Sequence, residues 1–176
     1  MVSGLAYGVD CIAALGALAA EDNPYPTVAV LGSGVDVVYP AANRDIYAQI
    51  IARGAVVSEF LPGTKALPSN FPMRNRIISG LSRGVLVVEA AAKSGTLITV
   101  DCALEQGRDV FALPGRITDP KSEGTNALLR EGHAKFTLSA EDVLEEYGGW
   151  RAVKAQTLSE PENLSLEQAV IRRLLL

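Results

Sequence analysis

The chain has 176 residues, of which 48% are hydrophobic and 20% are charged, and its formal net charge is −4. This is the composition of a globular domain with its own core, and no apolar run reaches the roughly 18–20 residues that span a bilayer. The negative net charge argues against binding of nucleic acid through bulk charge.

The first residues lack the basic and apolar regions of a signal peptide, so we expect a cytoplasmic protein. His133 is the only histidine, which leaves little material for a histidine-based metal site or a Ser-His-Asp triad. Cys11 and Cys102 both fall in helical patterns and are expected to be reduced, buried thiols. We therefore expect neither a metal nor another cofactor.

Apolar runs alternate with helical patterns along the chain. Five runs predict strands, at residues 27–31, 55–58, 85–88, 109–113 and 135–138. Six patterns predict helices, at about residues 9–21, 43–53, 73–82, 97–106, 125–131 and 140–147. Continuous apolar strands indicate burial on both faces, as in a parallel sheet. The alternation predicts an α/β fold with a doubly wound, mainly parallel sheet.

The two ends of the chain suggest a piece of a longer protein. Residues 2–6 resemble the end of a strand followed at once by a helix start, so we expect a strand and a helix before them. We predict one domain over residues 1–149 and a linker over 150–163. An amphipathic helix capped by Ser165 follows, and it is expected to begin a small, winged-helix-like module at 164–176. The alternative is a terminal helix packed on the sheet.

A basic segment lies in the middle of this acidic chain. Between Lys65 and Lys93 there are five cations and one carboxylate, Glu89, which gives a local charge of +4. Such a patch is compatible with a focused anion site. The alternative is chance clustering on a solvated face.

Four loops are expected to meet at the carboxyl ends of the strands, where open α/β sheets bind ligands. Glycines there permit close backbone approach, and free amides at helix starts favour anions. The candidate contacts from these loops are Ser3, Gly4, Gly32, Gly34, Lys65, Lys93, Ser94, Gly95 and Thr96. Neither a complete dinucleotide fingerprint nor a P-loop motif is present.

The helix that opens near Phe71 adds further candidates, namely Asn70, Phe71, Arg74, Asn75 and Arg76. Guanidinium groups bind phosphate bidentately or stack on bases. Arg74 and Arg76 lie roughly 200° apart on a helix, so one is expected to face the groove while the other makes a structural pair. Phe71 is either a core residue or a stacking platform for a base.

Glu89 ends the most apolar strand and has two interpretations. A carboxylate there could serve as base or nucleophile in an enzyme that cleaves N-glycosidic bonds. The interpretation that we favour is a pair with a neighbouring arginine or a loop amide, because no partner acid is evident.

A self-association surface is predicted near the last strand. Adjacent Leu128 and Leu129 lie about 100° apart on a helix, so one packs inward while the other points partly outward. Phe136 lies on the final strand, which is expected at the edge of the sheet. Exposed edges invite pairing across a two-fold axis, so we predict a homodimer through this region.

Several stretches together resemble the DprA (Smf) family of DNA-processing proteins. They include Ser3-Gly4-Leu5-Ala6, Val28 through Asp36 with Tyr39-Pro40, Phe71 through Ser82, Glu89-Ala90, Ser94 through Thr99, Ala103 through Arg108, and Pro114-Gly115. The family's upstream Gly-Ser-Arg motif is absent, and no basic residue stands directly before Phe71-Pro72.

The resemblance implies an extended Rossmann-like domain that binds single-stranded DNA and forms dimers. It also implies a protein that protects incoming DNA and helps to load the RecA recombinase during natural transformation. The family is not known for enzymatic activity. The competing hypotheses are a phosphoribohydrolase or deoxyribosyltransferase using Glu89, and a small-nucleotide sensor. Against the first, the Pro-Gly-Gly-x-Gly-Thr loop of the phosphoribohydrolases is missing, and Pro114-Gly115-Arg116 stands in that area.

Overall fold

The structure is a computed structural model that describes residues 1–20 and 23–148. The chain divides into two compact units, Met1–Val143 and Leu144–Leu176. The first unit contains both sheets, and helix α6 (Ala140–Glu146) crosses into the second. The predicted linker and C-terminal module, residues 150–176, lie outside the described residues.

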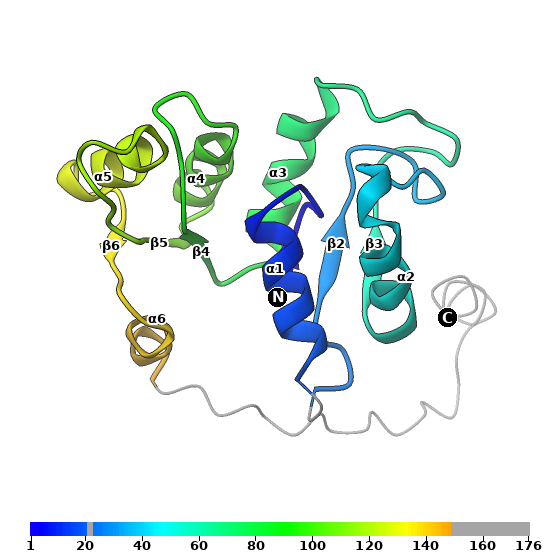
Figure 1. Ribbon diagram of the computed structural model, residues 1–176, viewed down its shortest axis with the longest axis horizontal. Helices are drawn as coiled ribbons and strands as arrows, with labels where there is room; N and C mark the ends of the chain where they lie inside the picture. Colours follow the sequence, from blue (N-terminus) through cyan, green and yellow to red (C-terminus); the bar gives the residue numbers. More distant parts are fainter. Residues whose placement is uncertain (21–22, 149–176) are drawn as a thin grey trace. The chain divides into compact units, whose positions relative to one another are not determined.

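The first sheet is parallel and has the order β1-β2-β3, formed by β1 (Val2–Ser3), β2 (Val28–Val30) and β3 (Ala55–Val57). The connecting helices are α1 (Val9–Leu18) and α2 (Arg44–Arg53), the latter preceded by the 3-10 turn η1 (Ala41–Asn43). Both helices lie beside β2 (Figure 1). Their buried side chains share a core with one face of β2, formed by Leu5, Ala14, Leu18, Ala29, Leu31 and Ile50.

Helix α3 (Asn70–Gly80) leads into the second sheet, which is also parallel and has the order β4-β5-β6. Its strands are β4 (Gly84–Val87), β5 (Asp109–Ala112) and β6 (Lys135–Phe136). Helices α4 (Thr96–Glu105) and α5 (Glu123–Arg130) connect them, with the 3-10 turn η2 (Pro120–Ser122) before α5. The second core consists of Val87, Ala90, Val100, Ala103, Val110, Ala112 and Leu128.

The parallel α/β pattern is confirmed, with two differences from the sequence-based prediction. The strands pair as two three-stranded sheets, not as one continuous sheet. In addition, β4 is not buried on both faces, because Leu86 is 45% exposed. The reason is that α4 and α5 pack on the face that presents Val85 and Val87, whereas Leu86 points to the opposite face.

Helix boundaries differ from the prediction by a few residues. Helix α1 ends at Leu18 instead of residue 21. Helix α3 begins at Asn70, three residues before the predicted start, and Pro72 therefore lies in its first turn, where the missing N–H costs no hydrogen bond. This earlier start places Asn70 and Phe71 on the helix itself, so their positions are fixed by α3. Strand β6 ends its sheet order, as predicted for an edge strand.

No helix among residues 1–20 and 23–148 is long and apolar enough to cross a membrane.

Candidate functional site

The loop after β1 is held by side chains from two helices. The amides of Gly4 and Ala6 both donate to Oδ2 of Asp10 at 3.0 Å. Leu5 is fully buried with a positive φ of 56°, and its carbonyl accepts a 2.9 Å hydrogen bond from Nδ2 of Asn43. The predicted contacts Ser3 and Gly4 are both buried. The Gly4 and Ala6 amides are therefore engaged within the protein and are not free to hold an anion.

Arg74 of α3 is an internal brace. Its side chain is only 7% exposed, and Nη1 donates to the carbonyls of Gly4, at 2.8 Å, and of Val30. Its Nε donates to Oδ1 of Asn75 at 3.2 Å. Burial lowers the pKa of Arg74, and the negative charge of Asp10 opposes that effect. The guanidinium links the end of β1 to the end of β2.

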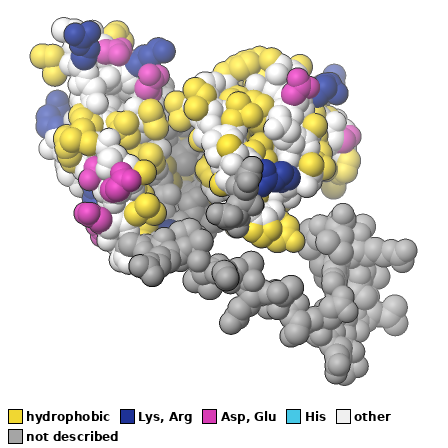
Figure 2. Space-filling model, turned by 60° about the horizontal axis from the view of Figure 1, so that its bottom comes forward, with side chains coloured by type: hydrophobic (Ala, Val, Ile, Leu, Met, Phe, Trp, Pro, Cys, Tyr) yellow, Lys and Arg dark blue, Asp and Glu magenta, His cyan; other side chains and the backbone are white. Residues whose placement is uncertain are grey.

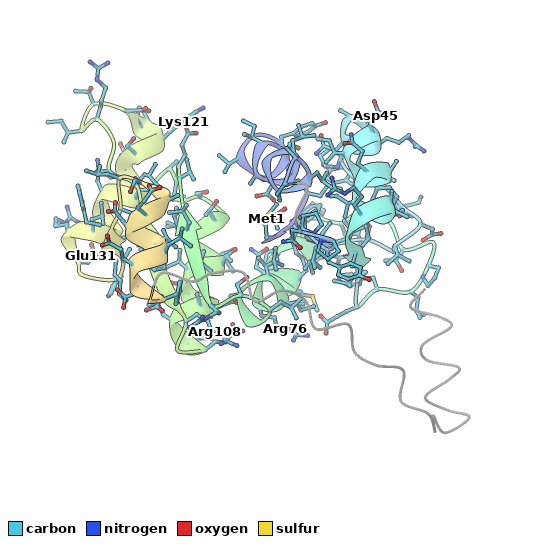
Figure 3. All side chains as sticks on the ribbon, turned by 90° about the horizontal axis from the view of Figure 1, so that it is seen from below. Met1, Asp45, Arg76, Arg108, Lys121 and Glu131 are labelled. Atoms are coloured by element: carbon cyan, nitrogen blue, oxygen red, sulfur yellow. The ribbon has the colours of Figure 1, made fainter. Side chains whose placement is uncertain are left out.

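Arg76 has the opposite environment. It is exposed and forms an ion pair with Glu59. Its backbone carbonyl accepts a 2.9 Å hydrogen bond from Nε2 of Gln106, and Arg108 donates to Gly80 at 3.0 Å in the same contact between α3 and the end of α4. Arg76 and Arg108 lie near one another there (Figure 3). Of the two arginines, Arg76 is thus the one that solvent reaches.

The loop after β2 is packed against the segment after β3. The amide of Gly34 donates to the carbonyl of Thr64 at 2.9 Å, and a Cβ at Gly34 would stand 2.6 Å from the carbonyl oxygen of Leu61. The carboxylate of Asp36 accepts from the amide of Gly63 at 2.7 and 2.9 Å. Glycine is required at position 34 because the segment after β3 approaches it closely.

An aromatic pair lies where the loop after β2 meets α3. The rings of Tyr39 and Phe71 stack with centroids 5.5 Å apart and an angle of 29° between their planes. A Cβ at Gly32 would stand 2.8 Å from Cδ1 of Phe71, and Cζ of Arg74 lies 5.7 Å from the centroid of the same ring. Asn70 donates through Nδ2 to the carbonyl of Gly32 at 3.0 Å. Phe71 is therefore half-buried and fixed in place.

Sequence reasoning did not include Tyr39 among the site residues. A signal was present, because Tyr39 closes the loop after a buried strand at the same sheet edge to which Phe71 was assigned. The stacking partner lies 32 positions away in the sequence, so the pair itself becomes visible only in the fold.

The loop before α4 is the open part of the site. Lys93 and Gly95 are exposed, and nothing lies within 4 Å of a Cβ built at Gly95. The hydroxyl of Ser94 accepts from the Thr96 amide at 3.2 Å and lies 3.1 Å from Oγ1 of Thr96. Asn75 reaches this loop through a 3.4 Å hydrogen bond from Nδ2 to the carbonyl of Gly95. The chain of contacts Gly4–Arg74–Asn75–Gly95 thus connects the first loop with the fourth.

The cations of the basic segment come from separate elements of the chain. On the face that Figure 2 shows, Lys and Arg side chains stand in small separate groups, several of them beside acidic side chains. Lys65 is exposed on the segment between β3 and α3, and Lys93 is exposed on the loop before α4. A ligand of this site would meet individual cations among backbone and polar groups.

Glu89 is exposed and pairs with Lys121, with 3.7 Å between Oε2 and Nζ. The predicted ion pair is therefore present, with a lysine in place of the expected arginine. Within the described ranges, no group of three or more His, Cys, Asp or Glu side chains could hold a metal ion. Cys11 and Cys102 are both free thiols as predicted, but they are half-buried and not buried, and desolvation raises the pKa of each.

The predicted dimer residues differ in exposure. Leu128 belongs to the second core, and Leu129 packs partly against that core. Phe136 on β6 is 61% exposed, and Leu138 just beyond it is exposed as well. Of the predicted surface, Phe136 and the outer part of Leu129 are accessible, whereas Leu128 is not.

Comparison with known proteins gives a consistent result. The family model described as DNA recombination-mediator protein A matches residues 1–148. The DNA processing protein DprA of Streptococcus pneumoniae (strain ATCC BAA-255 / R6) is 50% identical over 147 residues, which cover 84% of this chain and 51% of that protein. Protein Smf of Escherichia coli (strain K12) is 49% identical over 146 residues, which cover 82% of this chain and 38% of that protein.

Two solved structures share the fold. The X-ray structure of DprA from Streptococcus pneumoniae has a TM-score of 0.75 at 49% identity, covering 82% of this chain and 50% of that one. A structure that describes the unique single-stranded DNA binding mode of DNA processing protein A from Helicobacter pylori has a TM-score of 0.73 at 31% identity. The match covers 83% of this chain and 64% of that one. These matches confirm the predicted Rossmann-like class. The chain spans about half the length of its Streptococcus relative and 38% of the length of its Escherichia relative.

Proposed function

Since this chain belongs to the family of DNA recombination-mediator protein A, we propose that it is a DNA-processing protein that binds single-stranded DNA. The observation that carries the proposal is the likeness to the Helicobacter relative, a structure that describes single-stranded DNA binding. The loops at the carboxyl ends of the strands supply a matching chemistry. These loops carry exposed cations, a helix start and an aromatic pair.

We place the phosphate contacts on the exposed side chains and not on the buried ones. Lys65, Arg76 and Lys93 are reached by solvent, and Ser94 with Gly95 opens α4. Cations and helix-start amides bind phosphates whatever the base. The amides of Ser94 and Thr96 already donate within the loop, so we propose the Gly95 amide as the one that binds phosphate. The buried predicted residues act indirectly in this proposal, because they hold the loops in place. Those residues are Ser3, Gly4, Gly32, Gly34, Asn70, Arg74 and Asn75.

We further propose that the whole protein protects incoming DNA, helps to load the RecA recombinase in natural transformation, and works as a cytoplasmic homodimer. Support comes from the family description, which names a recombination mediator. For the dimer, support comes from Phe136 and Leu138, two exposed apolar side chains at an edge strand. Two subunits would present two DNA sites and raise the apparent affinity through avidity.

We propose binding without catalysis. Glu89 is exposed to water and paired with Lys121, whereas general bases and nucleophiles are usually poised by burial or by a second acid. The test is a nucleotide-release assay run beside a binding assay with the same preparation. We expect retention of an oligothymidylate and no release of base from nucleoside monophosphates. Release of base that is lost in Glu89→Gln would replace this proposal with the enzymatic one.

A further inference from the structure

Tyr39 and Tyr7 are both exposed on loops that follow strands of the first sheet, and Tyr39 is the one whose ring stacks on Phe71. The side chain of Tyr39 is 49% exposed, whereas Phe71, on which it stacks, is half-buried. Phe71 is enclosed by the backbone of Gly32 and by the guanidinium of Arg74. A planar ligand that approaches the pair from solvent therefore meets the Tyr39 ring first.

The ring of Tyr39 is also held in a defined orientation. The loop that carries it is fixed before Tyr39, where Ser33 donates to the carbonyl of Val37 at 2.8 Å and Tyr47 donates to the carbonyl of Val35. It is fixed after Tyr39 as well, where the amide of Asn43 donates to the carbonyl of Pro40 at 3.0 Å. Behind the ring lies Phe71 on α3, in an offset stack of the kind that aromatic pairs prefer. A rigid, half-exposed ring with a fixed backing loses little conformational entropy when a second planar group stacks on it.

We propose that Tyr39 is the platform on which an unpaired base of the bound strand stacks, with Phe71 as its fixed support. This inference rests on the proposed single-stranded DNA binding and adds to it the group that receives a base. The phosphates lie on the cations and the α4 start, while the base lies on Tyr39. Duplex DNA is excluded from this contact because its bases are already stacked on one another.

The alternative role for Tyr39 is structural, as a cover for Phe71. The two roles predict different ligand dependence. If Tyr39 only covers Phe71, its removal lowers the stability of the fold and changes the affinity equally for strands with and without bases. A stacking platform contributes about 1–3 kcal/mol per base, or about 5- to 100-fold in affinity, and only when a base is present.

The test is fluorescence anisotropy with a labelled oligothymidylate and an abasic oligonucleotide of the same length, on wild type, Tyr39→Ala, Tyr39→Phe and Tyr25→Ala. Tyr25 is the matched control, a 78% exposed tyrosine before β2, at the opposite end of that strand. We expect Tyr39→Ala to lose about 5- to 100-fold in affinity for oligothymidylate but less than two-fold for the abasic strand. Tyr39→Phe and Tyr25→Ala should bind both strands like wild type.

Equal binding of oligothymidylate by wild type and Tyr39→Ala would overturn the stacking role while leaving the proposed function intact. If wild type itself binds no oligothymidylate, the proposed function fails and the stacking role fails with it. A second measurement does not depend on a variant. Under ultraviolet light, an oligonucleotide that contains 5-iododeoxyuridine should cross-link to Tyr39. A cross-link to Tyr25, or to Phe71 alone, would contradict the inference.

Discussion

Arg74 occupies the space in which any side chain at position 4 would lie. A Cβ built on Gly4 would stand 2.1 Å from Nη2 of Arg74, although the two residues are 70 positions apart in the sequence. Nη1 of the same guanidinium donates to the Gly4 carbonyl. The glycine and the arginine therefore depend on each other, and the loop after β1 keeps its shape only while both are present.

Gly4→Ala should destabilise the protein strongly. The added methyl group must displace a buried cation and its hydrogen bonds, which we expect to lower the free energy of unfolding by about 2–4 kcal/mol. Urea denaturation measures the change. The matched control is Gly95→Ala, whose new Cβ meets open space at a helical φ of −59°, and this variant should unfold at the wild-type midpoint or slightly above it.

Arg74→Ala should lower the melting temperature markedly. The sequence makes Arg74 a candidate phosphate contact, but the guanidinium is buried and satisfies two backbone carbonyls. Removing it leaves buried acceptors without a donor, at a cost of about 2–4 kcal/mol. A variant that melts like wild type and has merely lost DNA binding would show that Arg74 contacts the ligand directly.

Arg76→Gln should behave in the reverse way. Its ion pair with Glu59 is exposed, so the loss should change the free energy of unfolding by less than about 1 kcal/mol. If Arg76 contacts phosphate, binding should weaken and the salt dependence should decrease by about one counterion. The companion variant Glu59→Gln removes the carboxylate that competes with phosphate, and it should bind single strands more tightly than wild type. Unchanged binding in both variants would remove Arg76 from the site.

Gly95→Val tests the start of α4. The site around Gly95 is open, so the variant should fold normally, while its branched side chain would hinder the approach of a phosphate to the backbone amide of residue 95. We expect at least a ten-fold loss of affinity, measured by anisotropy, with an unchanged circular dichroism spectrum. Affinity equal to that of Gly95→Ala would show that no phosphate approaches this loop.

Phe136→Glu should give a folded monomer if the exposed end of β6 forms the dimer. A charge buried in an apolar interface costs more than the interface gains. Light scattering at tens of micromolar would give the mass. Leu129→Glu should act similarly with some loss of stability, because Leu129 also packs on the second core. Ile117→Glu, at an exposed position on another loop, is the control and should stay dimeric.

The local features of this fold could be predicted from its sequence, because strands, helices and turns are specified by nearby residues. The apolar runs located the strands after β1, and adjacent Leu128 and Leu129 divided into inner and outer side chains as their helical angle required. The identity of the buried arginine could not be predicted. Helical spacing separates the faces of Arg74 and Arg76, but the carbonyls that receive Arg74 belong to Gly4 and Val30, far away in the sequence.

The same limit applies to the site. The four loops were located correctly at the ends of strands, yet the sequence does not show which backbone amides are already engaged. Asp10 accepts hydrogen bonds from the amides of Gly4 and Ala6, and these bonds depend on the conformation of the loop between β1 and α1. Tyr39 was missed because its role depends on the ring of Phe71, which reaches it only through tertiary packing.

The central claim is that this chain binds unpaired DNA through phosphate contacts at one edge of the fold. The most direct test is a titration of labelled oligothymidylate at low and at high salt, in competition with unlabelled duplex of the same length and with thymidine monophosphate. We expect binding that weakens steeply with salt, because phosphate contacts release counterions. Duplex and monophosphate should compete poorly. Binding that is independent of salt, or equal competition by duplex, would contradict the claim.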